Sequence, residues 1–340
     1  MENKSLGNPN IHKKLQRLTY DALWEAAITT LLNKKLKSLE VLCPKCKQKG
    51  LLFSKWIKGP AKKPLFVCHA NGENQPSLCP INTESSSELK YEIGLSRSDV
   101  LKLLRIGKPI ALFSGGQDSL CLLHYISSLA KSIHKQITAL HADTTAGFPE
   151  VEAYVQRVCD HLDIPLEIVR PPNDYFDLAK RWGIPGAKSR WCCKTLKVAP
   201  LRRYLSQIKE KIVVFDGIRA AESHIRAKYL PVWYHPSFRC ISVSPLFHWS
   251  DLKIREYIEK QSLPASPAAN LNTSAECWCG AYKSRKDFEA LLNIHPEIFD
   301  KLIEVEEAQN GKFTFLYEDG EKIALHSLKT NFQNAKETRK

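Results

Sequence analysis

From about residue 108 onward, short apolar runs alternate with segments whose apolar positions recur every three to four residues. We expect five of the runs to be strands: KPIALFS (108–114), QITALHADT (136–144), PLEIVRP (165–171), KIVVFDGIR (211–219) and CISVSPLF (240–247). Apolar residues recur at helical spacing in 120–133, 148–162 and 249–263, which predicts a helix in each. In the last of these, Ser250 is the expected N-cap. The alternation predicts an α/β fold, with a parallel sheet, helices on both faces and ligands at the carboxyl ends of the strands.

The regions before and after this alternation have patterns of their own. Ile11, Leu15, Leu18 and Ala22 recur at helical spacing, which predicts an amphipathic helix over 11–33. A helical period returns near the end, in 285–310. We therefore divide the chain into a basic helical part (1–40), a cysteine-bearing module (41–90), the α/β domain (91–265), and a Cys-x-Cys segment with a helical C-terminal region (266–340).

The charge of the chain is positive and unevenly distributed. The formal net charge is +14, and residues 1–63 hold 14 Lys and Arg against four Asp and Glu. This excess favours a polyanionic partner, above all nucleic acid, although a merely solvated face is the alternative. No apolar run approaches the roughly 18 residues that cross a bilayer, and the N-terminus lacks a signal-peptide core. We expect a cytoplasmic protein with no membrane partner, and nothing in the sequence sets its oligomeric state.

The hexapeptide SGGQDS stands where the first strand of the α/β domain ends and a helix begins. Glycines there let the backbone approach an anion, and the helix N-terminus supplies unpaired N–H groups. The two serine hydroxyls can donate hydrogen bonds, and the aspartate can position Mg²⁺. We expect a phosphate site rather than a plain strand–helix turn. Its residues are Ser114, Gly115, Gly116, Gln117, Asp118 and Ser119.

This hexapeptide resembles the PP-loop of ATP pyrophosphatases and lacks the Walker A pattern. Three later segments resemble motifs of the phosphoadenosine phosphosulfate (PAPS) reductase family, in the same order and spacing over about residues 95–300. They are HADTTAGFPE (141–150), RWCCKTLKVAPL (190–201) and DGIRAAESHIRA (216–227). The resemblance implies an adenine nucleotide alpha-hydrolase-like fold that binds ATP with Mg²⁺.

Three further residues are candidates for nucleotide binding. Asp143 is expected to end a strand beside the loop, near where a nucleotide would lie. Arg219 and Arg226 are a helical distance apart across Glu222, so both can face one anion. The planar guanidinium grips phosphate or sulfate in two places. The alternative is an Arg–Glu surface pair on a helix.

Eleven cysteines without a secretory signal indicate metal or catalytic thiols rather than disulfides. Cys43 and Cys46 form a two-residue knuckle, followed by two β-like runs and then by Cys68 and Cys79. This layout resembles a zinc ribbon and implies structural Zn²⁺. Because ten residues separate Cys68 from Cys79, His69 is the alternative fourth ligand, and iron could take the same ligands. Three others are expected in the apolar core: Cys121, Cys159 and Cys240.

The second group comprises Cys192-Cys193 and Cys277-Trp278-Cys279. In one branch of the PAPS reductase family, a Cys-Cys pair and a later Cys-x-x-Cys bind a [4Fe–4S] cluster, which needs four thiolates. Here the second motif is one residue shorter. The other interpretation makes Cys277 or Cys279 a sulfur-carrying nucleophile, because AECWCG is similar to the E-C-G motif of the reductases. The expected catalytic residues are Asp118, Cys193, Cys277 and Cys279.

Two functions follow from the resemblance. In the first, ATP adenylates a substrate, expected to be nucleic acid as in tRNA thiolation or DNA phosphorothioation. Sulfur on a thiol or cluster, from a donor such as a cysteine desulfurase, then displaces AMP. The alternative is a sulfonucleotide (PAPS or adenosine phosphosulfate) reductase that releases sulfite with a thioredoxin-type reductant. The complete loop, and the roughly sixty residues after Cys279, favour the first. The family's reductases carry a degraded loop and place E-C-G near the chain end. A zinc-ribbon nucleic-acid binder with a vestigial nucleotide domain is a third alternative, against which the complete loop argues.

Overall fold

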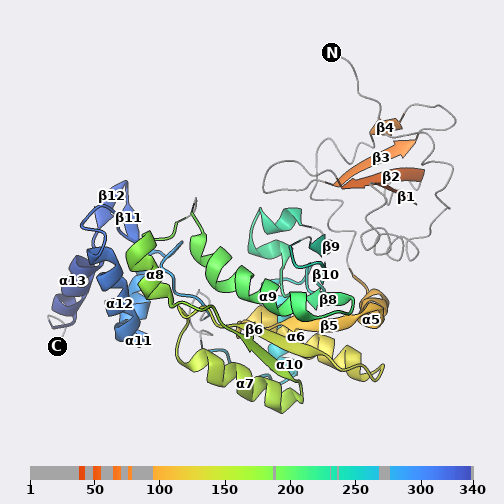
Figure 1. Cartoon of the computed structure of the whole chain (residues 1–340), viewed down its shortest axis with the longest axis horizontal. Coiled ribbons are helices and arrows are strands. Elements are labelled where there is room, and N and C mark those ends of the chain that lie inside the picture. The colour runs from red at the N-terminus through yellow and green to blue at the C-terminus, as the bar shows by residue number, and fades with distance from the viewer. Residues whose placement is uncertain are drawn as a thin grey trace. The chain divides into compact units, whose positions relative to one another are not determined.

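A computed structural model of the chain shows the α/β architecture and the elements around it (Figure 1). The residues that it describes are 38–42, 49–54, 64–69, 76–78, 95–186, 189–229, 231–235, 237–267 and 276–337. The helix expected over 11–33 lies outside them. Among the described helices, none combines the length and the apolar character that a membrane span requires.

A small antiparallel sheet precedes the α/β region. Its strands, in hydrogen-bonded order, are β1 (Ser38–Leu42), β2 (Lys49–Ser54), β3 (Pro64–His69) and β4 (Pro76–Leu78). The two β-like runs expected after the first cysteine knuckle correspond to β2 and β3. Cys68 is part of β3, whereas Cys43, Cys46 and Cys79 fall outside the described residues, so the zinc site stays a prediction.

The central sheet has six strands in the order β7-β6-β5-β8-β10-β9. Their bounds are β5 (Lys108–Leu112), β6 (Thr138–Ala142), β7 (Leu166–Val169), β8 (Ile212–Phe215), β9 (Val232–His235) and β10 (Cys240–Val243). β6 runs parallel to β7, and β8 runs parallel to β10. The five expected strands are confirmed. β9, which pairs with β10 in the antiparallel direction, was not expected from the sequence. It follows two short 3₁₀ turns, so it does not fit the strand–helix alternation from which the other strands were predicted.

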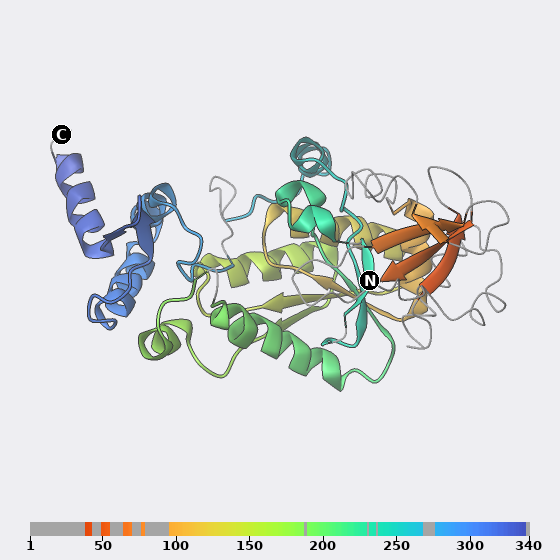
Figure 2. The same ribbon diagram turned by 90° about the horizontal axis from the view of Figure 1, so that it is seen from above.

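Helices lie on both sides of these strands (Figure 2), as the alternation predicts. They are α5 (Arg97–Ile106), α6 (Gln117–Lys131), α7 (Glu150–Leu162), α9 (Ala199–Gln207) and α10 (Asp251–Lys260). Helix α8 (Tyr175–Trp182) packs instead against α12 (Pro296–Glu307) of the C-terminal region. The expected helices over 120–133, 148–162 and 249–263 correspond to α6, α7 and α10. The cysteines expected in the core are buried there: Cys121, Cys159 and Cys240.

The chain divides into two compact units. One comprises Met1–Ile110, Ser128–Lys135 and Glu210–Tyr257, and the other comprises Ala111–Ser127, Gln136–Lys209 and Ile258–Lys340. The second unit holds the phosphate loop, Asp143 and the four cysteines of the second group. Arg219 and Arg226 belong to the first unit.

The C-terminal region is helical, as expected, with a small hairpin inserted. Its elements are α11 (Arg285–Ile294), α12 (Pro296–Glu307), β11 (Leu316–Glu318), β12 (Glu321–Ile323) and α13 (Leu325–Glu337). Buried Phe288 contacts the rings of Phe299 and Phe315, with centroids 6.3 and 6.4 Å away. Ser284 and Asp287 form a capping box that starts α11.

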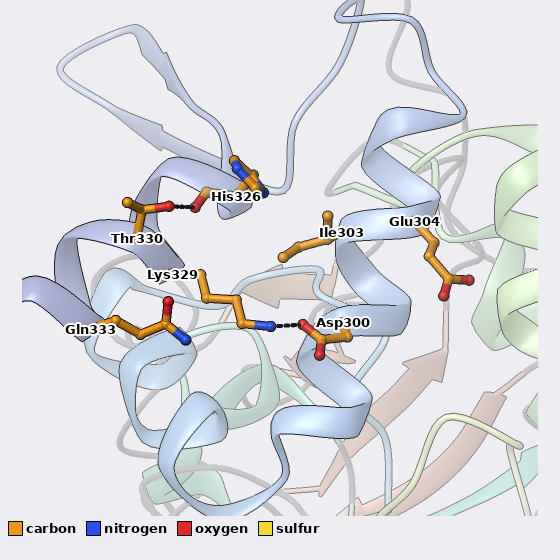
Figure 3. Close-up of a pocket in the computed structure, with 7 residues that line it drawn as sticks. All are labelled: Asp300, Ile303, Glu304, His326, Lys329, Thr330 and Gln333. Atoms are coloured by element: carbon orange, nitrogen blue, oxygen red, sulfur yellow. Dashed lines mark hydrogen bonds and ion pairs between the residues drawn. The ribbon is translucent and has the colours of Figure 1, made fainter.

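A cavity of about 430 Å³ lies between α12 and α13 (Figure 3). Asp300 and Lys329 form an ion pair across it, with 2.5 Å between Oδ1 and Nζ. Glu304, at its edge, binds Lys180 of α8. The lining is completed by Ile303, His326, Thr330 and Gln333. None of these residues belongs to the S-G-G-x-D-S loop, to the three other motifs or to the cysteine groups, so we look for the active site among those segments instead.

Candidate active site

The S-G-G-Q-D-S loop, the predicted phosphate site, closes on itself between β5 and α6. The Ser119 hydroxyl donates to the carbonyl of Gly116 at 2.9 Å and accepts from the backbone N–H of Ser114 at 3.3 Å. Gly115 has φ +82°, a region that disfavours side chains, and a Cβ there would lie 3.4 to 3.6 Å from side chains of α7. Gln117 and Asp118 begin α6, whose N-terminus therefore opens into the loop. Such a loop presents backbone N–H groups to an anion.

A later segment covers the loop and was not expected from the sequence. The Ser266 hydroxyl donates to the carbonyl of Gly115 at 2.5 Å, and Tyr154 donates to the carbonyl of Pro264 at 3.0 Å. Burial raises the pKa of Tyr154 to about 12, so its hydroxyl stays a donor at neutral pH. These contacts span more than a hundred residues, and no local pattern marks them.

Asp143 directly follows β6, as expected, at the edge next to the loop. β5 and β6 are neighbours in the sheet, where Phe113 N–H donates to the carbonyl of Leu140 at 3.0 Å. The Asp143 carboxylate accepts from Thr145 N–H at 2.8 Å and from Arg170 Nε at 3.1 Å. These bonds hold Asp143 at the carboxyl end of the sheet.

Four thiols, separated by more than eighty residues in sequence, meet in a cluster that we call the four-thiol cluster. Each of the four thiols shifts the pKa of at least one of the others, so these side chains lie near one another. The neighbouring thiol of Cys192 lowers the pKa of Cys193 to about 7, whereas the pKa of Cys192 is raised to about 12. Cys193 is therefore the thiol that ionises first, and thiolate is the form that binds metals and attacks electrophiles.

Cys193 also begins a π-helical turn, Cys193–Val198, that runs into α9. Single turns of this kind occur often at functional sites. Lys197, on this turn, pairs with the buried Glu276 at 2.5 Å. The ion pair connects the Cys-Cys segment to the residue that precedes Cys277.

The segment after β6 holds the Cys-x-Cys segment in place. Thr144 donates to the carbonyl of Glu276 at 2.8 Å, and Trp278 N–H donates to the carbonyl of Ala146 at 2.5 Å. The buried ring of Trp278 stacks on Phe148, with centroids 5.7 Å apart. Two motifs that the sequence presents separately, D-T-x-x-x-F-P-E and C-W-C, are thus one packed structure.

Gly280 completes this packing. It has φ +75°, and a Cβ there would overlap the ring of Phe315 from the C-terminal region. Tyr175, on α8, donates its hydroxyl to the carbonyl of Cys279 at 2.6 Å. The backbone around Cys279 is therefore held from two sides.

The two arginines of the other unit do not share one helix. Arg219 precedes the 3₁₀ turn Ala220–Glu222, and Arg226 starts a second turn. The Arg226 guanidinium binds Glu222, which also accepts from Arg219 N–H at 2.8 Å. Arg219 is buried, and its guanidinium pairs with Asp251 at 2.8 Å. The Arg–Glu pair considered above is present, and anion binding by the arginines stays a prediction.

The donor set of the four-thiol cluster fits a [4Fe–4S] cluster, which takes four thiolates. As the side chains stand, no three His, Cys, Asp or Glu in the described part of the chain form a group that could hold a metal ion. Binding a cluster would therefore require the thiols to turn toward a common centre.

The sequence is similar to proteins of sulfur metabolism. Residues 108–270 match the family model of the phosphoadenosine phosphosulfate reductase domain. An adenosine 5'-phosphosulfate reductase from Bacillus cereus is 27% identical over 164 residues, which cover 47% of this chain and 67% of that enzyme. An uncharacterized protein from Methanocaldococcus jannaschii is 30% identical over 223 residues, which cover 61% of this chain. The chain spans less than half of that protein, 45% of its length.

Among solved structures, the phosphoadenylyl-sulfate reductase from Candida auris overlaps 59% of this chain and 97% of its own, with a TM-score of 0.43 and 20% identity. The matched residues of the family model include the phosphate loop, Asp143, the Cys-Cys pair and both arginines, and they end before Cys277. Just under half of the chain, residues 108–270, is therefore similar to the phosphoadenosine phosphosulfate reductase domain.

Proposed function

We propose that this chain activates a nucleic acid with ATP and supports the transfer of sulfur to it. An oxygen of the substrate attacks the α-phosphorus of ATP, the bond to the β-phosphate breaks, and pyrophosphate leaves. The adenylated oxygen is then displaced as AMP by a sulfur nucleophile, supplied by a donor such as a cysteine desulfurase. When the donor delivers persulfide sulfur, the outer sulfur forms the new bond to the substrate as AMP leaves, and a second thiol then attacks the inner sulfur and breaks the S–S bond. The two thiols end as a disulfide, which a thiol reductant must reduce before the next turnover.

The observation that carries this proposal is that the S-G-G-x-D-S loop and the segment of Cys277–Cys279 lie next to neighbouring strands of the sheet. The complete S-G-G-x-D-S loop follows β5, and the segment that holds Cys277–Cys279 follows β6, the next strand in the sheet. Because helix α6 connects them as a crossover between parallel strands, both loops lie at the carboxyl edge of the sheet. A reaction that releases pyrophosphate and then uses sulfur needs both sites at one edge.

Particular residues have distinct roles in this proposal. The backbone of Ser114–Ser119 holds the pyrophosphate part of ATP, and Asp118 positions Mg²⁺, which neutralises the charge that develops on it. Cys193 provides the most acidic thiol of the four-thiol cluster. A [4Fe–4S] cluster, when bound by Cys192, Cys193, Cys277 and Cys279, would supply an iron site that can hold sulfur.

A sulfonucleotide reductase is the second candidate. The Bacillus cereus relative carries that name, and a thiol with a pKa of about 7 suits a nucleophile that attacks sulfur. The complete loop favours the first candidate, because a sulfonucleotide has no β,γ-pyrophosphate to bind.

The test is pyrophosphate release from labelled ATP, measured with anaerobically purified full-length protein, with and without tRNA or DNA. We expect nucleic acid to stimulate release and Asp118→Ala to lower the rate by about 10²-fold or more, the usual effect of removing a group that stabilises transition-state charge. Asp177→Ala is the matched control, because Asp177 stands in the first turn of α8, as Asp118 does in α6. Its rate should equal that of the wild type.

Two outcomes would contradict the proposal. One is an Asp118→Ala variant that releases pyrophosphate at the wild-type rate. The other is a protein that ignores ATP but releases sulfite from PAPS when thioredoxin is added, which would establish the reductase instead.

A further inference from the structure

A ladder of aromatic rings leads from the four-thiol cluster to the protein surface. Tyr175, whose hydroxyl binds the carbonyl of Cys279, stacks on Trp191, with centroids 5.9 Å apart and planes 14° from parallel. Trp191 contacts Trp182 edge to face at 5.2 Å. Tyr175 is fully buried, Trp191 is half-buried and Trp182 is 53% exposed. The last ring therefore faces solvent, while the first touches the cysteine backbone.

A second exposed ring follows the Cys-x-Cys segment in sequence. Tyr282, three residues after Cys279, is 60% exposed. The guanidinium of Arg190 lies over its ring, 4.7 Å from the centroid, and Arg190 Nε donates to the Tyr282 hydroxyl at 2.7 Å. Arg190 directly precedes Trp191, so the two exposed rings are joined through adjacent residues. The arginine fixes the orientation of the tyrosine ring at the surface.

The charges around these rings are mainly positive. Arg181 and Lys194, both exposed, flank Trp182 and Cys193 in sequence, and Arg190 is exposed as well. Among the acidic groups of the adjoining elements, Glu304 binds Lys180 and Glu276 binds Lys197, while Asp177 lies in the first turn of α8, at the opposite end of that helix from Trp182. An exposed aromatic face beside arginine and lysine is the composition that binds single-stranded nucleic acid, since bases stack on the rings and cations contact the phosphates.

We propose that Trp182 and Tyr282, with Arg190, form a stacking platform for unpaired bases of a single-stranded nucleic acid. The platform holds a base that has left its helix beside the four-thiol cluster, where sulfur would be transferred. A base within a duplex is stacked on its neighbours and cannot reach a reactive group in a protein until it is unstacked. This inference rests on the proposed function and specifies the form of its substrate.

The test measures binding of a fluorescein-labelled 20-nucleotide single strand to the full-length protein by fluorescence anisotropy at fixed salt. We expect Trp182→Ala and Tyr282→Ala each to weaken binding by about 10-fold, within the range measured when a stacking ring is removed. Trp182→Phe and Tyr282→Phe keep a ring and should restore most of the affinity. The matched control is Leu252→Ala, which removes a side chain that is 66% exposed in the other unit and should change nothing.

The same protein should bind the duplex of that sequence more weakly than the single strand. Alanine variants that bind the single strand as tightly as the wild type would overturn the platform, and so would equal binding of strand and duplex. If those variants instead change only the oligomeric state, the rings are a contact between copies of the chain. The proposed function fails separately, when wild-type protein neither binds nucleic acid nor responds to it with pyrophosphate release.

Discussion

Gly280 illustrates how one residue can fix the shape of the cysteine segment. Its φ of +75° disfavours any side chain, and the ring of Phe315 occupies the space that a Cβ would need. That ring is itself packed against Phe288 in the C-terminal region. The glycine of the sequence E-C-W-C-G is therefore required by a contact with a residue 35 positions later.

We predict that Gly280→Ala lowers the free energy of unfolding by about 1–3 kcal/mol more than Gly320→Ala does, since overpacking a buried contact has that cost. Gly320 is the matched control, because its φ is also positive (+84°) but no atom lies within 4 Å of a Cβ placed there. Gly320→Ala should lose only the roughly 1–2 kcal/mol of the unfavourable backbone conformation. Denaturant unfolding of the two variants checks this, and equal losses would show that the Phe315 contact is unimportant.

At the scale of elements, helix α12 organises the C-terminal region through one buried carboxylate. Glu306 accepts hydrogen bonds from the Thr314 hydroxyl, from Phe315 N–H at 3.2 Å and from Leu325 N–H at 2.6 Å. These donors precede β11 and begin α13. A single side chain thus ties a helix, a hairpin and the next helix together.

Replacing the Glu306 carboxylate should destabilise the packing of α12, the hairpin and α13. We predict that Glu306→Gln lowers the free energy of unfolding by about 2–4 kcal/mol, because an amide cannot accept from all three donors and leaves buried N–H groups unpaired. Glu304→Gln, two residues earlier on α12, removes an exposed ion pair with Lys180 and should cost less than about 1 kcal/mol. Denaturant titration of both variants makes the comparison, and similar losses would argue against the buried network.

The spacing of apolar residues along the sequence predicts most of these helices and strands. That spacing is a local property, because it follows from which side chains of one element face the core. The five expected strands and three expected helices are present for this reason. α8, α9 and the π-helical turn were not expected, because their apolar positions extend over too few turns to stand out. β9 is defined by its pairing with β10, which its own composition does not reveal.

The whole molecule carries a net charge of +14, with an excess of ten positive charges in the first 63 residues. If nucleic acid is the substrate, its binding must depend strongly on salt, because lysine and arginine release condensed counterions from the phosphates. The stacking platform, by contrast, contributes a contact that salt hardly screens. The two contributions can therefore be separated by experiment.

We predict that the affinity for a single strand falls on the order of 10²-fold between 50 and 200 mM salt, as about six phosphate contacts imply. Trp182→Ala should reduce the affinity by the same factor at each salt concentration and leave the slope unchanged. Anisotropy titrations at four salt concentrations measure both quantities. A flat salt dependence would exclude phosphate contacts as the main source of affinity.

The sequence by itself determined the alternating α/β pattern, the place of S-G-G-Q-D-S between a strand and a helix, and the buried positions of Cys121, Cys159 and Cys240, because each depends on neighbouring residues. Only the tertiary structure decided which distant segments meet. It placed Ser266 against the carbonyl of Gly115, tied Thr144 and Ala146 to the segment that holds Cys277–Cys279, and set the ring of Phe315 against Gly280. Contacts of this kind follow from how helices and loops pack on the sheet, and the spacing of residues along the chain does not encode them.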